Sequence, residues 1–171
     1  MTKFKELGEL SQIIAESKKQ GLKIGLSHGV FDLVHPGHIQ HFIAAKKMVD
    51  CLIVSITADE FVNKGPGRPL FNEEIRVATL SALEAIDYVV ISRAKTSENL
   101  IGVIKPDFYF KGSDYKNSED DVTGKIEDEK RAVELNGGKI EFTNELTSSS
   151  SRLINNYFDA LQPSIRKWLD K

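Results

Sequence analysis

The chain has 171 residues, of which 40% are hydrophobic and 28% charged, and its formal net charge is −2. This size and composition predict one soluble domain that buries its own core, and they exclude a disordered chain. The weakly negative charge argues against a general binder of nucleic acid or of anionic membranes, because such proteins depend on a strong positive field.

Apolar residues at helical spacing alternate along the chain with short apolar runs, which predicts helices that alternate with strands. An amphipathic helix ends near Gly21, and a strand over 22–27 leads to a helix that begins at Pro36 and runs to about Val49. The elements expected next are strands over 51–57, 88–91, 108–110 and 139–142, and helices over 72–84, 97–104 and 125–135. Their order predicts a Rossmann-like α/β fold, a doubly wound parallel sheet with helices on both faces.

The segment between the first strand and the next helix carries two histidines. His35 and His38 lie three residues apart at the start of the helix, so both imidazoles share one helix face. Gly37 lets phosphates approach the backbone, and the free amides and positive dipole end of the helix favour an anion. In such a sheet, ligands bind beyond the carboxyl ends of the strands, where this segment is expected. The segment therefore predicts a phosphate site.

A glycine-rich loop after the second predicted strand carries two cations. Lys64 and Arg68 lie in this loop, and Arg76 lies on the first turns of the helix that follows. A loop of this composition is also typical of a solvated surface turn. Its position beside the expected strand ends nevertheless adds positive charge where a phosphate would bind.

Two further segments carry polar residues near the same edge. The first follows the strand over 108–110 and contains Lys111, Gly112, Asp114 and Tyr115. The second is a run of four serines over 148–151 that precedes an apolar helical pattern, and capping accounts for one of them. A polar turn and a helix cap are the structural alternatives for these two segments.

The pattern Gly-x-Phe-Asp-x-x-His-x-Gly-His over 29–38 resembles the signature of the cytidylyltransferase-like nucleotidyltransferases. The resemblance implies that His35 and His38 are catalytic and contact the α-phosphate of a nucleotide. It also implies that nucleotide is bound by residues of the same pattern, namely Gly29, Phe31, Asp32 and Gly37. Asp32 is equally suited to bracing the turn by accepting backbone hydrogen bonds.

The same resemblance assigns residues to the rest of the nucleotide. Lys64 and Arg76 match the basic residues that hold the triphosphate, and Arg68 is a further candidate. Asp59 matches the acidic residue after the second strand. The serines at 149–151, which are Ser149, Ser150 and Ser151, look like the hydroxyl run that binds the β- and γ-phosphates.

Three segments, over 64–69, 83–90 and 111–115, are most similar to the heptose-phosphate nucleotidyltransferase domain that is found fused to a sugar kinase. This similarity implies a nucleotidyltransferase domain over 1–158 and a C-terminal tail or linker over 159–171. It also implies that residues 111–115 bind the acceptor substrate, a sugar or polyol phosphate. The protein is further expected to form a homodimer and to be able to occur as one half of a kinase fusion.

The sequence thus predicts an enzyme that couples a nucleoside triphosphate, ATP or CTP, to a sugar or polyol phosphate. Pyrophosphate is released, and the product is an activated precursor of cell-surface polysaccharide. We expect Mg²⁺ to be bound through the nucleotide phosphates, without a dedicated set of protein ligands. The alternatives are a nicotinamide- or pantetheine-type nucleotidyltransferase and a non-catalytic module that senses nucleotides.

The remaining features concern location and partners. The single cysteine, Cys51, has no partner for an internal disulfide, which fits a reducing cytoplasm. The sequence contains no apolar run of about eighteen residues and no signal-peptide core. We therefore expect a cytoplasmic protein with neither nucleic acid nor membrane as a partner.

Overall fold

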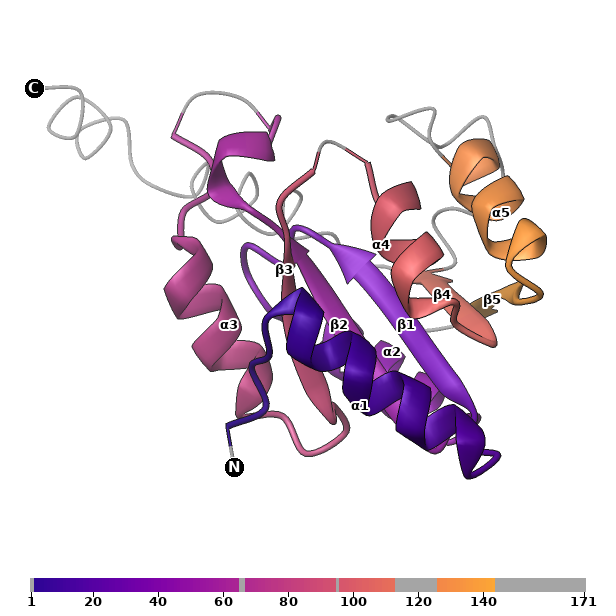
Figure 1. Ribbon diagram of the computed structural model, residues 1–171. Helices are drawn as coiled ribbons and strands as arrows, with labels where there is room; N and C mark the ends of the chain where they lie inside the picture. Colours follow the sequence, from indigo (N-terminus) through magenta and orange to yellow (C-terminus); the bar gives the residue numbers. More distant parts are fainter. Residues whose placement is uncertain (1, 65–66, 95, 113–125, 144–171) are drawn as a thin grey trace, which may run out of the picture.

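The computed structural model describes residues 2–64, 67–94, 96–112 and 126–143, and in this part of the chain five parallel strands form one sheet (Figure 1). The strands are β1 (Ile24–Gly29), β2 (Cys51–Thr57), β3 (Tyr88–Ser92), β4 (Phe108–Gly112) and β5 (Lys139–Thr143). Their order in the sheet is β3-β2-β1-β4-β5. The first strand of the chain is therefore central, and Leu26 at its middle pairs with Ile53 on one side and Tyr109 on the other.

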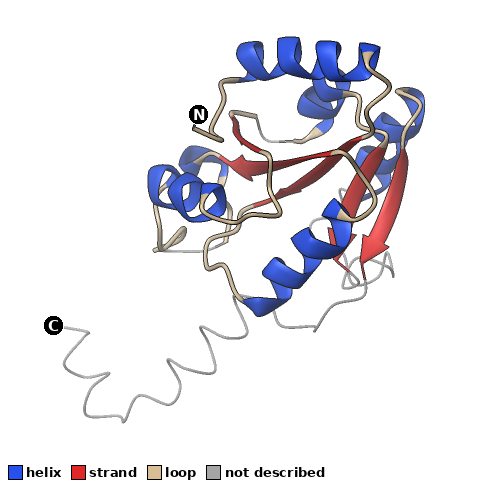
Figure 2. Cartoon of the chain, turned by 90° about the horizontal axis from the view of Figure 1, so that it is seen from below, coloured by secondary structure: helices blue, strands red, loops and turns tan. Residues whose placement is uncertain are grey.

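Helices cover both faces of the sheet, as Figure 2 shows. The helices of the described ranges are α1 (Leu7–Lys19), α2 (Pro36–Lys46), α3 (Glu73–Ser81), α4 (Glu98–Ile104) and α5 (Ile126–Leu135), with a 3₁₀ turn η1 over Asp59–Phe61. α2 and α3 pack on one face, whereas α1, α4 and α5 pack on the other. The predicted doubly wound α/β fold is confirmed.

The side-chain alternation of the central strands explains why their sequences read as continuous apolar runs. Ile24 and Leu26 face α1, α4 and α5, and both are fully buried. On β2, Ile53 faces the same side while Leu52 and Val54 face α2 and α3. A strand buried on both faces needs apolar residues at every position.

Most element boundaries lie within three residues of those expected from the sequence. β2 begins and ends at the predicted residues, and Asn72 caps α3 by accepting a hydrogen bond from the amide of Ile75 at 3.0 Å. β1 is shifted toward the carboxyl end and reaches Gly29, because its ladder with β2 continues as far as Ile56. α2 ends at Lys46, earlier than expected.

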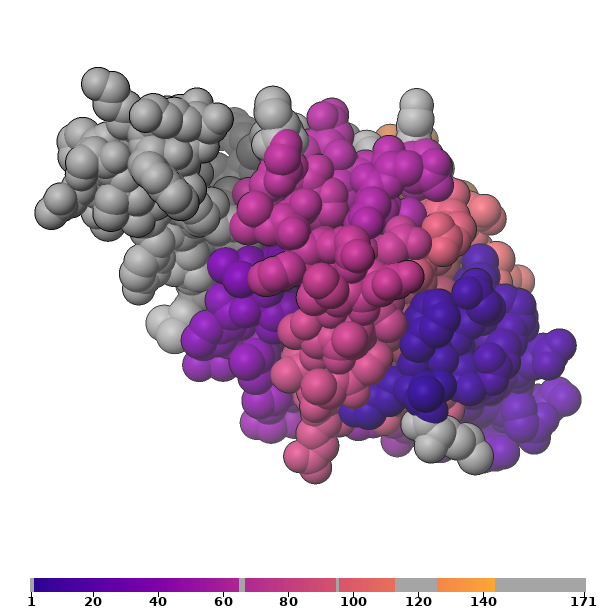
Figure 3. All heavy atoms as spheres, turned by 90° about the vertical axis from the view of Figure 1, so that its left-hand side faces the viewer, coloured from indigo at the N-terminus to yellow at the C-terminus, as the bar shows by residue number. Residues whose placement is uncertain are grey.

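The winding of the chain brings the candidate segments to one edge. The turn before α2 follows β1, η1 follows β2, and Gly112 ends β4, so all three lie at the carboxyl ends of the strands. Figure 3 shows α3 and the segment before it in the middle of one side of the molecule. Within the described ranges, no helix combines the length and apolar content needed to span a bilayer.

Substitutions at two glycines test this packing, because one should destabilise the protein and the other should stabilise it. A Cβ added at Gly138, before β5, would overlap the carbonyl oxygen of Pro106, whereas one added at Gly102 in α4 meets nothing within 4 Å. We expect Gly138→Ala to lower the free energy of unfolding by about 1–3 kcal/mol. Gly102→Ala should raise it by about 0.5–1 kcal/mol, since alanine favours the helix. Urea unfolding measures both, and a Gly138→Ala variant as stable as the parent would contradict the packing.

Candidate active site

The turn from β1 into α2 stacks two imidazole rings at the carboxyl edge of the sheet. His35 has an extended backbone at the N-cap, and Pro36 takes the first helical position. The ring centroids of His35 and His38 lie 3.8 Å apart, with 26° between the ring planes. His35 is buried and His38 is partly buried. The two rings therefore lie side by side beyond the end of the central strand.

Phe31 shapes this turn. Its backbone has a φ of 50°, in the left-handed region that few residues other than glycine adopt. Its ring lies edge-on to His38 at 5.2 Å and to Phe42 at 5.3 Å. A Cβ at Gly29 would lie 3.1 Å from the Phe31 ring, so the absence of a side chain there leaves room for it. Gly37 is buried at the start of α2.

Burial keeps His38 neutral. It lowers the pKa of His38 to about 3; electrostatic interactions with His35, His41 and Lys64 act in the same direction, and a hydrogen bond with the backbone of Leu33 opposes them. At neutral pH the His38 ring therefore donates one hydrogen bond as an uncharged imidazole.

Asp32 ties the cationic loop to the histidine turn. Its carboxylate accepts hydrogen bonds from the Arg68 side chain at 2.6 Å and from the amides of Leu70 at 2.7 Å and Phe71 at 3.1 Å. The Asp32 side chain is fully buried. In this structure it braces the segment before α3, which is the role that its turn position suggested.

The loop presents two cations beside the histidines. Nη2 of Arg68 is buried and has no hydrogen-bond partner among the described residues. The Lys64 side chain reaches solvent, but surrounding protein atoms and the charge of Arg68 lower its pKa. Both features fit a loop that receives an anion, since a buried guanidinium nitrogen without an acceptor is costly.

Arg76, which was expected to hold the triphosphate, is buried and hydrogen-bonded within the protein. Its guanidinium donates to the carbonyl oxygens of Val30 at 2.7 Å, Thr57 at 2.8 Å and Phe71 at 3.0 Å. It also forms an ion pair with Asp59 at 2.5 Å. Four of its donor positions are thus taken up, and direct contact of Arg76 and Asp59 with nucleotide stays a prediction.

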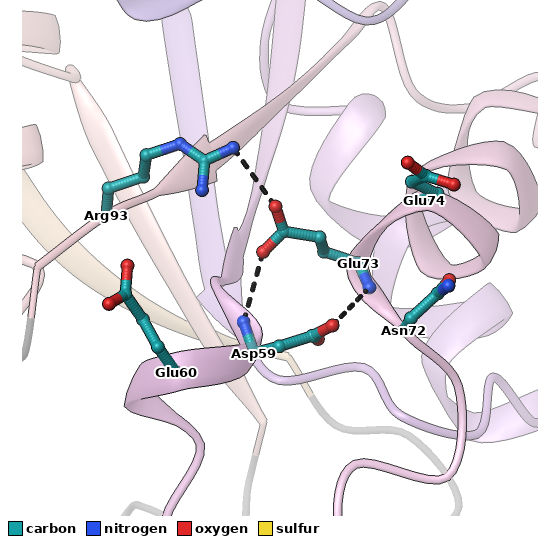
Figure 4. Close-up of a pocket in the computed structure, with 6 residues that line it drawn as sticks. All are labelled: Asp59, Glu60, Asn72, Glu73, Glu74 and Arg93. Carbon is teal, nitrogen blue, oxygen red and sulfur yellow. Dashed lines mark hydrogen bonds and ion pairs between the residues drawn. The ribbon is translucent and has the colours of Figure 1, made fainter.

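The other oxygen of Asp59 belongs to an acidic pocket of about 330 Å³, drawn in Figure 4. Asp59 and Glu73 each accept a hydrogen bond from the backbone amide of the other at 3.1 Å, and Arg93 contacts Glu73 at 3.0 Å. The lining residues are Asp59, Glu60, Asn72, Glu73, Glu74 and Arg93. The pocket is lined by four carboxylates and one guanidinium, so its negative charge disfavours the binding of a triphosphate.

Lys111, one of the residues expected to contact the acceptor, lies in a buried ion pair. Its ammonium is 2.6 Å from the Glu129 carboxylate on α5 and 5.1 Å from the centroid of the Tyr109 ring. Burial alone would raise the pKa of Glu129, but the Lys111 charge and hydrogen bonds from Lys111 and Ser97 outweigh it and lower the pKa. An acceptor phosphate would have to compete with Glu129 for Lys111.

Several predicted site residues cannot be placed. Gly112 is the last residue of β4, and the segment that follows it is not described. The residues that lie outside the described ranges are Asp114, Tyr115, Ser149, Ser150 and Ser151.

Sequence reasoning gave His41 no role, yet it joins three elements. Its Nε2 lies 2.8 Å from the Ser27 hydroxyl on β1, and its Nδ1 lies 2.5 Å from the Thr143 hydroxyl on β5. Burial and then the charge of Lys111 lower the pKa of His41 to about 4. Its spacing of three residues from His38 is the signal that could have found it, because positions i and i+3 share a helix face.

Comparison with known proteins places this geometry in a family. A family model described as cytidylyltransferase-like matches residues 26–156. The bifunctional protein HldE of Haemophilus influenzae (strain PittGG) is 40% identical over 138 residues, which cover 80% of this chain and 28% of that protein. Its counterpart in Nitrobacter winogradskyi is 44% identical over 110 residues, which cover 63% of this chain and 22% of that protein. The chain therefore spans less than a third of the length of these relatives.

Two solved structures share the fold. A lipopolysaccharide core biosynthesis protein from Thermoplasma volcanium superposes with a TM-score of 0.59 at 24% identity, covering 75% of this chain and 100% of that one. A pantoate-beta-alanine ligase from Francisella tularensis superposes with a TM-score of 0.64 at 18% identity, covering 91% of this chain and 73% of that one. At these identities the likeness supports the fold alone.

The Lys111–Glu129 pair yields a stability prediction. Lys111→Met leaves the Glu129 carboxylate buried without its cation, and we expect a loss of about 3–5 kcal/mol in the free energy of unfolding. The double variant Lys111→Met/Glu129→Gln should recover much of this loss, since no buried charge remains. Urea unfolding of the three proteins tests this. A single variant that keeps the parent's stability and only raises the acceptor KM would favour the acceptor role.

The low pKa of His41 yields a pH dependence. The folded state holds His41 neutral down to about pH 4, whereas the unfolded chain protonates it near pH 6.5. The contribution of neutral His41 to the free energy of unfolding should therefore be fully present above pH 6.5. It should decrease as the pH falls toward 4, by up to about 1.4 kcal/mol per pH unit. His41→Gln should show a smaller slope between these limits in urea unfolding. Equal slopes in the parent and the variant would contradict the assignment.

Proposed function

The chain belongs to the cytidylyltransferase-like family, and on this basis we propose that it transfers a nucleotidyl group from ATP or CTP to a sugar or polyol phosphate. The observation that carries the proposal is the stacked pair of His35 and His38 at the start of α2, beyond the end of the central strand. Two ring donors and the free amides of a helix start suit the α-phosphate of a nucleotide.

The proposed acceptor is based on relatives that this chain resembles. The resemblance to heptose-phosphate nucleotidyltransferases, together with identities of 40% and 44% to HldE proteins, supports a sugar phosphate. The relatives are named bifunctional, and the matched region covers less than a third of them, which supports a second activity elsewhere in those proteins. We propose that the activated sugar is a precursor of cell-surface polysaccharide.

Transfer proceeds by in-line displacement. An oxygen of the acceptor phosphate attacks the α-phosphorus, the bond from that phosphorus to the bridging oxygen breaks, and pyrophosphate leaves with the electron pair. No general base is required, because a phosphate monoester is largely dianionic at neutral pH. The protein contributes positioning and charge stabilisation. The N–H groups of His35 and His38 donate to the α-phosphate oxygens as negative charge develops there.

The leaving pyrophosphate is held on the side of the cationic loop. Arg68 supports this assignment, because its Nη2 is buried without an acceptor among the described residues. Lys64 supports it through its electrostatic contact with His38, whose pKa it lowers. Ser149, Ser150 and Ser151 remain our candidates for the β- and γ-phosphates from the sequence.

Mg²⁺ enters with the nucleotide in this proposal. The described residues contain no group of three or more histidine, cysteine or acidic side chains arranged around a metal, and the Asp32 and Asp59 carboxylates already accept hydrogen bonds. We propose that phosphate oxygens and water hold the ion. When bound, it neutralises charge on the leaving pyrophosphate.

The decisive experiment is a pyrophosphate-release assay with four nucleoside triphosphates crossed with a panel of sugar and polyol phosphates. Release that requires a sugar phosphate supports the proposal. Release with a nicotinamide or pantetheine phosphate would change the acceptor class. Nucleotide binding without release would instead indicate a sensing module.

His38→Ala tests the catalytic role directly. We expect kcat to fall by roughly 10²- to 10³-fold with little change in the melting temperature, since the lost donor acts on charge that grows in the transition state. Gln40→Ala, at an exposed position of the same helix, is the matched control and should behave as the parent. Near-normal turnover by His38→Ala would remove this residue from the mechanism.

A further inference from the structure

Arg76 connects three strand and helix ends through one buried guanidinium. Its side chain is fully buried, and it bonds to residues on the turn after β1, at the end of β2 and just before α3. A guanidinium has five N–H donors, and protein atoms occupy four of them. We propose that Arg76 is a positioning residue for the histidine pair and not a ligand of the triphosphate; this inference rests on the proposed nucleotidyl transfer.

The first link runs from Arg76 to His38. Nη1 of Arg76 binds the carbonyl oxygen of Val30 at 2.7 Å, and Val30 immediately precedes Phe31. The left-handed backbone of Phe31 directs its ring against His38. Backbone in this region costs of order 1–3 kcal/mol and persists where the surroundings hold it in place. The bond to Val30 is one of the contacts that hold it.

The second link joins the histidine turn to the cationic loop. The carbonyl oxygen of Phe71 accepts from Nε of Arg76, while its amide donates to Asp32 on the histidine turn. Asp32 in turn binds Arg68. Arg76 thereby fixes the distance between the ring donors at the α-phosphate and the cations proposed for the pyrophosphate.

The third link explains why an arginine is required. Asp59 binds Nη2 of Arg76 at 2.5 Å and is itself held by the amide of Glu73 (Figure 4). The planar guanidinium reaches acceptors on three segments at once, which a lysine ammonium cannot reproduce on its single nitrogen. Arg76→Lys therefore keeps the positive charge but loses the fixed geometry.

The test compares Arg76→Lys with Arg93→Gln, a control at an exposed arginine that contacts Glu73. Two measurements are made: the side-chain nitrogen chemical shifts of His38 by NMR in the nucleotide-free protein, and kcat and nucleotide KM by pyrophosphate release. For Arg76→Lys we expect shifted His38 signals and a kcat lower by about 10- to 100-fold, because a displacement of about 1 Å costs on this scale. Nucleotide KM should stay within about threefold. Arg93→Gln should match the parent in both.

The outcomes separate the two roles. Unchanged His38 signals together with a large rise in nucleotide KM would make Arg76 a phosphate ligand and overturn the proposal. If Arg76→Lys does not fold, Asp59→Asn, which weakens the ion pair, should shift the His38 signals and lower kcat in the same direction by a smaller factor. Parent-like signals and kcat in Asp59→Asn would then overturn it.

The NMR measurement also separates this inference from the proposed function. It uses the free protein and needs no turnover. If the parent releases no pyrophosphate with any pair of substrates, the transfer proposal fails, while the His38 signals of Arg76→Lys still decide whether Arg76 positions that ring.

Discussion

The turn between Gly29 and Pro36 must take the chain from the central strand into α2, and this constraint organises the candidate site. A strand of a parallel sheet ends on one side of the molecule, and the next helix has to return across the face. Phe31 makes this reversal with a left-handed backbone, and its ring then packs against His38 and Phe42. The conformation that reverses the chain is thus the one that orients a proposed catalytic ring.

Buried polar contacts hold the carboxyl edge of the sheet around this turn. Arg76 joins the ends of β1 and β2 to α3, His41 joins β1 and β5 to α2, and Lys111 joins β4 to α5. Buried polar groups are stable only when they are paired, so each contact has a narrow range of geometry. The edge that is proposed to bind nucleotide is therefore fixed before substrate arrives, which favours catalysis by positioning.

The sequence was informative about elements because their signals are local. Apolar periodicity, Gly21 and the Asn72 cap are each recognised within a few residues, and such signals located every α-helix and strand of the described ranges but not the 3₁₀ turn η1. Side-chain partners were not predictable in the same way. Glu129 sits in an acidic helix, where a carboxylate normally faces solvent, and only the packing of α5 against β4 brings it to Lys111. No spacing in the sequence encodes that contact.

Arg76 illustrates the same limit within the site itself. Its position on the first turns of α3 predicts a location near the strand ends, and the structure places it there. What spacing does not reveal is that the carbonyl oxygens of Val30, Thr57 and Phe71 converge on its guanidinium. A positively charged residue near a phosphate site can bind the ligand or fix the surrounding backbone. The hydrogen-bond acceptors around the residue determine which of these roles it takes.

The distribution of charge allows a chain with net charge −2 to favour an anion at one place, which is what the proposed triphosphate site requires. Carboxylates gather in the pocket beside α3, whereas Lys64 and Arg68 lie beside the histidines. This arrangement of charge favours an anion beside the histidines over one in the acidic pocket. His38 remains neutral because its pKa is lowered, so it adds little to the binding of the ground state. In the proposed mechanism, the N–H groups of His35 and His38 interact most strongly with the negative charge that appears on the α-phosphate oxygens in the transition state, and this difference accelerates transfer.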